Sequence, residues 1–335
     1  MRVLLICNYK PGVGGISGQV EILQRKLRNE GHTADIFSTK GSVLWRLGLL
    51  GKLHKAARKY DVLHVHCCSG WGFLPAVVGV NVGRRLGKRV VLTYHGGGGE
   101  RFFAKHTRMV KHYLTRTDAN IVLSGFLGEV FTHYGIPYTT IPNIIEFDDT
   151  QFRKRTSIAP NYICVRAHEE LYNIPCILRA FRQVQTELPE ATLTLVGDGS
   201  QHEQLKQLAE DLGLHNVTFT GRVDNSTIYN YLNQADIMLS AHKVDNMPVS
   251  LLEAMNAGLL IISSDVGGVP YMIENNKTGF LFPSDDSNGL ANLMIKAVRH
   301  SSESIDIIQN AHQAINVYRW ENVRKQLYTT YGLSA

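Results

Sequence analysis

The chain has 335 residues, of which 44% are hydrophobic and 19% are charged, so it is long enough for two domains and too apolar to be disordered. Its five cysteines lack C-x-x-C spacing, which argues against a disulfide scaffold or zinc site and favours a reducing, cytoplasmic compartment: Cys7, Cys67, Cys68, Cys164 and Cys176. The opening run, MRVLLICNYK, is typical of a strand and not of a signal peptide, and no run approaches the ~18 apolar residues of a membrane-spanning helix. We therefore expect a soluble protein.

The net charge of +6 is unevenly distributed. Residues 1–150 contain 20 Lys and Arg against 10 Asp and Glu, whereas residues 151–335 contain 15 against 19. The two halves are therefore expected to face different partners.

In the first half, short apolar or β-branched runs alternate with longer stretches of helical period. The predicted strands are residues 2–9, 33–39, 62–67, 89–95 and 119–124, and the first predicted helix is 18–31. Strands that are apolar on both faces and separated by helices indicate a parallel sheet covered on both sides. This pattern predicts a Rossmann-like domain.

A polar and basic stretch, TQFRKRTSIAP, interrupts the alternation, and we place a linker at about residues 147–160. The alternation then restarts, with strands predicted at residues 161–167, 191–197, 217–221, 236–241 and 259–265. The sequence thus predicts an α/β fold of two successive domains, with ligands at the carboxyl ends of the strands.

The segment GVGGISGQ, residues 12–19, lies between the first strand and the first helix. Gly14 and Gly15 allow backbone N–H groups to approach an anion at the helix N-terminus. The segment departs from a dinucleotide fingerprint, because Ser17 replaces the third glycine and no acidic residue closes the second strand. A plain tight turn is the alternative.

The segment DNMPVSLLEAMNAG, residues 245–258, predicts a short helix with Pro248 in its first turn and Gly258 at its end. The free N–H groups at such a helix start suit a phosphate. Asp245 and Glu253 are separated by seven residues. A capping or dipole role is the alternative for these carboxylates.

The block at residues 245–282 resembles the signature of family 4 of the retaining glycosyltransferases. Other segments follow in the family's order: the glycine loop at 12–18, TYHGGG at 93–98, IPNIIE at 141–146, ICVRAHEELYN at 163–173, LVGDGS at 195–200, FTGRV at 219–223 and RWENVRKQLYTTY at 319–331. The resemblance implies the GT-B fold, in which two Rossmann-like domains face each other across a deep cleft. It assigns residues 1–148 to acceptor binding and 149–318 to nucleotide-sugar binding, with a C-terminal helix at 319–335 crossing back to the first domain.

In that family two Glu residues with seven residues between them lie over the donor, and Asp245 and Glu253 occupy their positions here. The resemblance implies that Asp245, one methylene shorter than Glu, meets the transferred sugar and that Glu253 meets the ribose. Arg166 matches the family's diphosphate-binding Arg, and a guanidinium can hold two phosphate oxygens. The family's Lys is missing, and Tyr172 near its position either donates its hydroxyl to the diphosphate or packs under the sheet.

His95 closes the strand TYH and matches a histidine that, in the family, lies beside the transferred sugar. A histidine satisfied by the backbone is the alternative. The other donor-binding candidates implied by the resemblance are Gly197 and Arg222, at the edge that receives the base, and Met247, Pro248, Val249 and Ser250, at the helix start.

The expected reaction is retaining transfer of a hexose from a UDP- or GDP-sugar to a hydroxyl of a glycan or lipid-linked acceptor, in cell-surface polysaccharide or glycolipid synthesis. No D-x-D motif is present. We therefore expect fixed positive charge and N–H dipoles, and no metal or other cofactor, to stabilise the leaving nucleoside diphosphate.

Two basic stretches, residues 43–60 and 101–117, combine positive charge with apolar residues, as do helices that bind an anionic membrane surface. Burial of the apolar side in the core is the alternative. Both stretches lie in the basic half, and family members with lipid-linked acceptors use this domain for them. Peripheral contact with the cytoplasmic face of a membrane is therefore expected.

Three other functions stay open. The Asp at position 245 and the missing Lys motivate a degenerate glycosyltransferase that binds nucleotide sugar without turnover. A nicotinamide dehydrogenase shares the two-domain pattern but not the fingerprint. Nucleic-acid binding suits a pI near 9.0, but no nucleic-acid motif accompanies the charge, so no such partner is expected.

Overall fold

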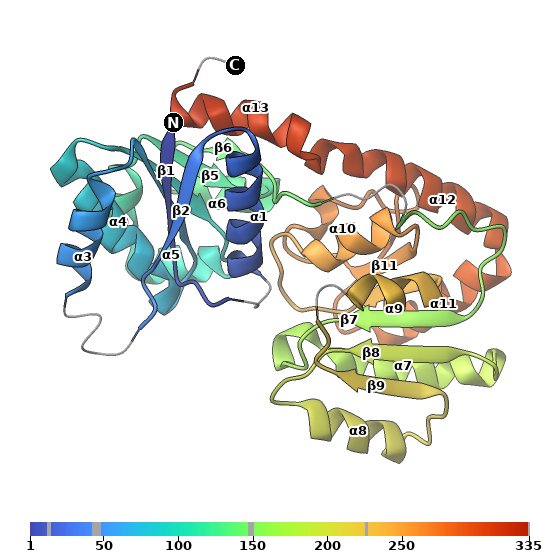
Figure 1. The fold of residues 1–335 in the computed structure, drawn as a ribbon. Coiled ribbons are helices and arrows are strands. Elements are labelled where there is room, and N and C mark those ends of the chain that lie inside the picture. Colours follow the sequence, from blue (N-terminus) through green and yellow to red (C-terminus); the bar gives the residue numbers. More distant parts are fainter. Residues whose placement is uncertain (12–14, 42–47, 147–150, 225–226, 334–335) are drawn as a thin grey trace. The chain divides into compact units, whose positions relative to one another are not determined.

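The computed structural model describes residues 1–11, 15–41, 48–146, 151–224 and 227–333. The chain divides into two compact units (Figure 1): unit 1 comprises residues 1–146 and 318–335, and unit 2 comprises residues 147–317.

Unit 1 is built on a parallel sheet of six strands in the order β2-β1-β3-β4-β5-β6. The strands are β1 (Arg2–Cys7), β2 (Thr33–Ser38), β3 (Val62–Cys67), β4 (Arg89–Tyr94), β5 (Ala119–Val122) and β6 (Thr139–Thr140). The helices are α1 (Ile16–Asn29), α3 (Leu49–Ala57), α4 (Leu74–Leu86), α5 (Gly99–Leu114), α6 (Gly125–His133) and α13 (Trp320–Tyr331). The strand order reverses between β1 and β3, which is where sheets of this kind bind ligands.

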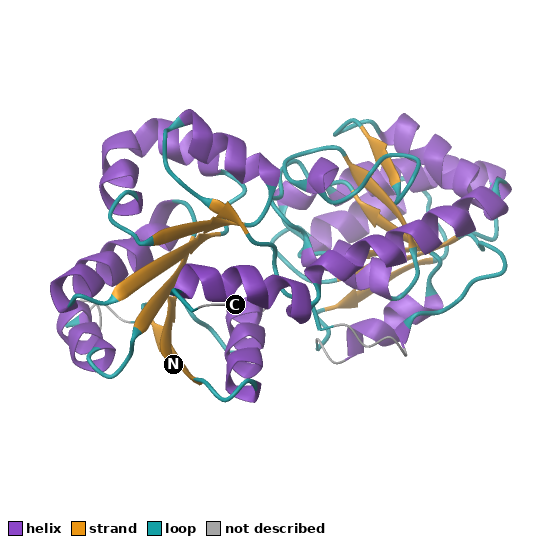
Figure 2. Cartoon of the chain, turned by 90° about the horizontal axis from the view of Figure 1, so that it is seen from above, coloured by secondary structure: helices purple, strands orange, loops and turns teal. Residues whose placement is uncertain are grey.

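Helices cover both faces of this sheet (Figure 2), and the side chains of β1 point alternately to one face and the other. Val3 and Leu5 pack in one cluster with residues of α1 and α13, whereas Leu4 and Ile6 pack in another with residues of α3 to α6. Because all four side chains are buried, the strand must be apolar on both faces.

Unit 2 repeats this plan with the strand order β12-β11-β10-β7-β8-β9. The strands are β7 (Asn161–Val165), β8 (Thr192–Val196), β9 (Val217–Gly221), β10 (Ile237–Ser240), β11 (Leu260–Ser264) and β12 (Phe280–Phe282). The helices are α7 (Ile174–Glu187), α8 (His202–Asp211), α9 (Ile228–Gln234), α10 (Val249–Asn256), α11 (Ser287–Arg299) and α12 (Ser301–Ala314). Here the order reverses between β7 and β10, so the residues that follow these two strands meet at one edge.

The predicted α/β fold with two Rossmann-like sheets is confirmed, and every strand predicted from the sequence is present. The sequence analysis missed β6 and β12, which have two and three residues and therefore too few positions to show a periodicity.

The last helix, α13, is part of unit 1. Trp320, Val323, Leu327 and Tyr331 are buried in the same cluster as β1 and α1. Polar contacts fix the helix further: the Trp320 indole donates to Glu30 at 3.0 Å, and Arg89 donates to the carbonyl of Thr330 at 2.7 Å.

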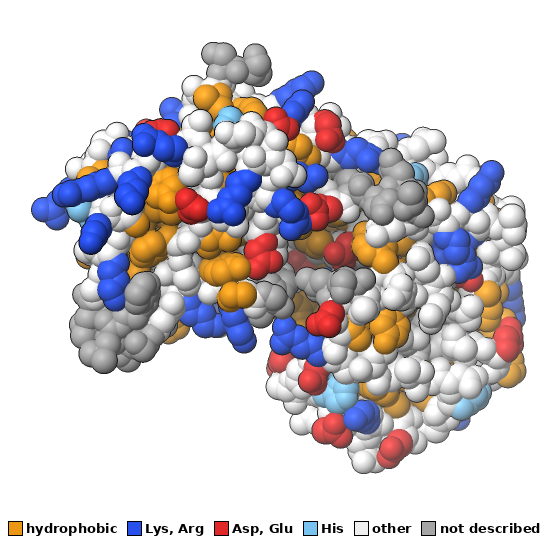
Figure 3. Space-filling model, viewed as in Figure 1, with side chains coloured by type: hydrophobic (Ala, Val, Ile, Leu, Met, Phe, Trp, Pro, Cys, Tyr) orange, Lys and Arg blue, Asp and Glu red, His pale blue; other side chains and the backbone are white. Residues whose placement is uncertain are grey.

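The helices of the two basic stretches turn most of their apolar residues inward, although Leu50 of α3 is 53% exposed. In α3 the inward residues are Leu49, Leu53 and Ala57, and in α5 they are Phe102, Phe103, Val110 and Leu114. Residues 43–47 lie outside the described part of the chain. Arg101, Lys105 and Arg108 of α5 are exposed, and Figure 3 shows Lys and Arg side chains spread over the visible face of unit 1. Membrane contact through these stretches stays a prediction, and it would depend on charge more than on an apolar face.

No helix among the described residues is long and apolar enough to cross a membrane.

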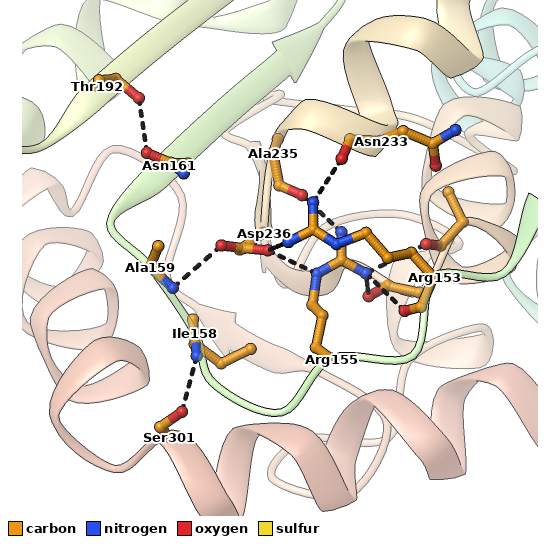
Figure 4. A network of polar contacts seen from close by, with 12 residues as sticks. Arg153, Arg155, Ile158, Ala159, Asn161, Thr192, Asn233, Ala235, Asp236 and Ser301 are labelled. Atoms are coloured by element: carbon orange, nitrogen blue, oxygen red, sulfur yellow. Dashed lines mark hydrogen bonds and ion pairs between the residues drawn. The ribbon is translucent and has the colours of Figure 1, made fainter.

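The segment that precedes β7 is held by a buried ion pair (Figure 4). Arg155 and Asp236 are almost completely buried, and Nε of Arg155 donates to Oδ1 of Asp236 at 2.7 Å. The remaining Arg155 donors bond to the carbonyls of Arg153, Ala235, Ala257 and Gly258. Arg153, which is half exposed, donates to the same carboxylate at 2.7 Å. The described part of the predicted linker is therefore anchored to unit 2.

We predict that Arg155→Ala lowers the free energy of unfolding by about 3–5 kcal/mol, because it leaves a buried carboxylate and several carbonyls without their donor. Arg153→Ala is the matched control and should cost no more than about 1 kcal/mol, since its side chain is half solvated. Urea denaturation measures both values. Equal losses of unfolding free energy for the two variants would contradict the conclusion that Arg155, and not Arg153, holds this segment.

Candidate functional site

The first part of the candidate site is the start of α10 in unit 2. The sequence predicts Pro248 in the first helical turn, but Pro248 is the residue before the helix, with ψ of 104°. The N–H groups of Val249 and Ser250 open the helix, and Leu251 bonds back to the carbonyl of Pro248 at 3.1 Å. Within the described residues the buried Ser250 hydroxyl has no hydrogen-bond partner. The helix start thus offers backbone and side-chain donors to an anion.

Arg166 and Asp245 come together at this edge of the sheet. Arg166 directly follows β7, Asp245 lies in the loop after β10, and Nη2 of Arg166 is 3.3 Å from Oδ2 of Asp245. The two side chains are 11% and 21% exposed. The contact is an ion pair without hydrogen-bond alignment, and within the described residues neither Nε nor Nη2 of Arg166 has a hydrogen-bond partner. Arg166 therefore retains donors for a ligand.

Tyr172 supports the guanidinium of Arg166 with its ring. Cζ of Arg166 lies 5.2 Å from the centre of the Tyr172 ring, a distance typical of a cation–π contact. Tyr172 therefore does not simply pack under the sheet: it helps to hold the one charged group that matches the family's diphosphate site.

Two glycines let the backbone pass close to these charged residues. At Gly197, with φ of 144°, a Cβ would overlap the carbonyl oxygen of Arg166, and at Gly267, with φ of 58°, it would overlap that of Asp245. The N–H of Gly268 also donates to the Asp245 carbonyl at 2.9 Å. Gly197 thus borders Arg166, and its predicted contact with the base stays a prediction.

Glu253 and His242 are further titratable groups near Arg166. Burial raises the pKa of Glu253 to about 7, against an opposing effect of the Arg166 charge. Burial, together with the nearby charge of Arg166, lowers the pKa of His242 to about 3. Nδ1 of His242 bonds to Ser240 at 2.6 Å. The sequence analysis missed His242, whose only signal is its place between β10 and Asp245.

Arg222 and Met247 are the remaining donor-binding candidates of unit 2. Arg222 follows Gly221 at the end of β9, and the Gly221 carbonyl accepts from the N–H of Gly197 at 3.1 Å. Met247 is buried just before α10. Their roles in donor binding stay predictions.

In unit 1, Gly15 and His95 lie at the carboxyl edge of the sheet. Gly15 is the residue before α1 and has φ of 67°, whereas Gly14 lies outside the described residues. The N–H of His95 donates to the carbonyl of Cys67 at 2.8 Å. Burial lowers the pKa of His95 to about 4, so the ring is neutral at neutral pH.

A small cavity in unit 1, with a volume of about 40 Å³, has His95 in its wall. His64 and His66 of β3 also line it, together with Val323 and Leu327 of α13. The sequence analysis missed both histidines, although their i, i+2 spacing in the strand VLHVHC places them on one face.

In the described part of the chain, no group of three or more His, Cys, Asp or Glu side chains could hold a metal ion.

Sequence models of two protein families match the chain. The description "Glycosyl transferases group 1" matches residues 148–314, and "Glycosyltransferase Family 4" matches residues 37–149. The chain belongs to the group 1, family 4 glycosyltransferases.

Individual relatives of this glycosyltransferase are distant. It is 25% identical to the N-acetyl-alpha-D-glucosaminyl L-malate synthase of Bacillus anthracis over 306 aligned residues. The alignment covers 85% of this chain and 78% of that protein. The chain is 26% identical to the phosphatidyl-myo-inositol mannosyltransferase of Mycolicibacterium smegmatis, over 50% of this chain and 43% of that protein. The structure of Anabaena HepE in complex with UDP matches 99% of this chain and 100% of HepE, with a TM-score of 0.80 at 20% identity. This likeness shows the GT-B fold.

We predict that Glu253 makes the stability of this glycosyltransferase depend on pH. Because its folded pKa of about 7 exceeds the ordinary 4.5, the native state holds a proton that the unfolded chain releases between these values. The resulting stabilisation is complete below pH 4.5 and is lost as the pH rises through 7. The free energy of unfolding of the wild type, relative to Glu253→Gln, should therefore fall on the order of 1–3 kcal/mol over this range.

The measurement is urea denaturation of both proteins at a series of pH values. The Gln variant is the control because it keeps every other titrating group. A difference that does not change with pH would contradict the prediction.

Proposed function

We propose that this glycosyltransferase transfers a hexose, with retention, from a nucleoside-diphosphate sugar to a hydroxyl of a glycan or lipid-linked acceptor. The observation that supports this most is the convergence of Arg166, Asp245 and Glu253 beside the start of α10. A cation with free donors, two carboxyl groups and a helix N-terminus suit the three parts of a nucleotide sugar: diphosphate, sugar and ribose.

The leaving group in this proposal is stabilised by Arg166 and by the N–H groups of Val249 and Ser250, without a metal or other cofactor. As the bond to the sugar breaks, negative charge grows on the diphosphate. The Nε and Nη2 donors of the buried Arg166 and the α10 dipole are fixed in advance and need no rearrangement, which is the condition for strong electrostatic stabilisation.

The two carboxyl groups take different roles. Asp245, the ion-pair partner of Arg166, would accept from hydroxyls of the transferred sugar. Glu253, whose pKa is near 7, would accept from the ribose hydroxyls when ionised. The acceptor would attack the face from which the diphosphate leaves, with the phosphate taking its proton, and His95 of unit 1 would contact the sugar.

We infer that the departures from the family pattern are adaptations and not defects. The ring of Tyr172 lies over Arg166, where an ammonium would repel the guanidinium. The shorter Asp245 already reaches 3.3 Å from Arg166, so a longer Glu would have to displace it. An active enzyme therefore fits these contacts better than a degenerate binding protein.

Relatives suggest which donors and products to try. HepE has been solved with UDP-glucose, and other relatives are named as GDP-mannose-dependent mannosyltransferases or as an amylovoran biosynthesis glycosyltransferase. We propose a UDP- or GDP-hexose as donor and a cell-surface polysaccharide or glycolipid as product.

We predict that one class of UDP- or GDP-sugar raises the melting temperature of the purified protein in the presence of EDTA, because the ligand binds only the native state. Arg166→Ala should weaken this donor roughly 10–100-fold, as expected for the loss of charge-assisted bonds. Arg179→Ala on α7, an exposed position, is the control and should bind normally. Proton NMR of the product tests retention. The transferase proposal is wrong if no donor binds and none is hydrolysed.

We also predict that Asp245→Glu and Tyr172→Lys each lower the kcat of donor turnover, by roughly tenfold. The longer carboxylate crowds Arg166, and the new ammonium repels it. Steady-state kinetics with the donor identified above measures this. A rise in kcat for either variant, and above all for the double variant, would favour the degenerate-enzyme hypothesis instead.

A further inference from the structure

The strand pair β3 and β4 brings three histidines together in unit 1. His64 and His66 lie on one face of β3, and His66 pairs with Thr93 in the register of β4. His95 follows β4 directly and continues the pairing, since its N–H bonds to the carbonyl of Cys67 at 2.8 Å. Neighbouring strands therefore place the rings of His66 and His95 side by side.

One contact joins these two rings. Nδ1 of His66 lies 3.0 Å from Nε2 of His95. Burial keeps the pKa of His66 well below its ordinary value and that of His95 at about 4, so both rings are neutral near pH 7. Two N–H groups would repel at this distance, and two lone pairs would not bond. One proton must therefore lie between the two nitrogens.

The surrounding titratable groups add no charge to the pair. His64 stacks beside His66 at 4.2 Å between ring centres, and its own nitrogens bond to the hydroxyls of Tyr331 and Thr93 at 2.7 Å each. Burial lowers the pKa of His64 to about 3 and raises that of Tyr331, so both are neutral. Within the described residues, the hydrogen bond between His66 and His95 is thus the interaction that distinguishes the two nitrogens of His95.

We propose that His66 is a positioning residue: it fixes the ring orientation and tautomer of His95 and leaves Nδ1 as the one ring nitrogen that His95 offers to a substrate. Within the described residues no hydrogen bond reaches Nδ1 of His95, and the side chain is partly exposed. In a histidine, the hydrogen bond made by one nitrogen sets the protonation of the other. The catalytic consequence rests on the proposed function, whereas the tautomer itself does not.

The test is nitrogen-15 NMR of free protein labelled in histidine, with His95 assigned by the signals lost in His95→Gln. In the wild type the two ring nitrogens of His95 should resolve as one protonated and one bare nitrogen. In His66→Leu both should shift toward the averaged values of a free imidazole. His66→Asn, whose amide can bond to Nε2 of His95, should restore the single tautomer.

His64→Leu is the matched control, because it removes a neighbouring buried imidazole of the same strand that makes no hydrogen bond to His95. It should destabilise the fold without changing the His95 tautomer. Averaged His95 nitrogens in the wild type, or an unchanged single tautomer in His66→Leu, would overturn the proposal.

Measuring donor turnover in these variants tests the catalytic role of His66 separately from the proposed transferase function. His66→Leu should lower kcat by about 10–100-fold with little change in donor KM, in the range found for residues that orient a ligating histidine, and His66→Asn should recover most of it. Unchanged kcat in a His66→Leu protein whose tautomer has shifted would remove the catalytic consequence. Absence of turnover in the wild type, with a single His95 tautomer present, would instead count against the transferase function.

Discussion

The buried pair of Arg155 and Asp236 holds the amino edge of the unit 2 sheet, and through it both ends of the segment that leads to the proposed donor site at the opposite edge. Asp236 is the residue before β10, and its backbone bonds to Asn161 and Leu260 of the strands on either side. Arg155 also donates to the carbonyls of Ala257 and Gly258, which follow α10. The segment from β10 to the end of α10 is thus held at both ends by one guanidinium. A cation at the C-terminus of α10 also complements the dipole whose positive end faces the proposed diphosphate site.

At the carboxyl edge of the same sheet, Arg166 is the central cation of the proposed site, as Arg155 is at the amino edge. It is close to the carboxylate of Asp245, to Glu253 with a pKa of about 7 and to the ring of Tyr172. In the proposed complex, a diphosphate next to Arg166 would make ionisation of Glu253 less favourable, whereas ribose hydroxyls that donate to Glu253 would make it more favourable. The pKa of Glu253 therefore lies where nucleotide binding can move it in either direction.

The sequence predicted the strands well because both sheets are buried on both faces, so that runs such as residues 3–7 and 162–165 are continuously apolar. It predicted that Arg166 and Asp245 belong to one site through their family motif, but not their direct ion pair. It could not distinguish the possible roles of Tyr172, because a tyrosine can pack with its ring or form a hydrogen bond with its hydroxyl, and the sequence is the same in both cases. It missed His66 because two histidines at alternate strand positions are common in cores, and only the register with β4 shows that one of them meets His95. The sequence also could not show whether the apolar face of α5 packs in the core or on a membrane, since amphipathic helices in both settings have the same periodicity.

Arg166 and His95 share a mode of support that differs from that of Arg155. Arg155 is held by a hydrogen-bonded counter-ion, whereas Arg166, beside its looser ion pair with Asp245, lies against the ring of Tyr172, and His95 bonds to the neutral ring of His66. A neutral neighbour orients the side chain without neutralising its charge, as for Arg166, and without occupying its second ring nitrogen, as for His95. Within the described residues, Arg166 pairs with Asp245 at 3.3 Å without hydrogen-bond alignment, so its Nε and Nη2 donors suit the phosphate oxygens of the proposed donor. A lysine in place of Tyr172 would add charge but remove this support, so the proposed diphosphate site, with one fixed cation fewer than the family pattern, would rely on a well-oriented Arg166 instead.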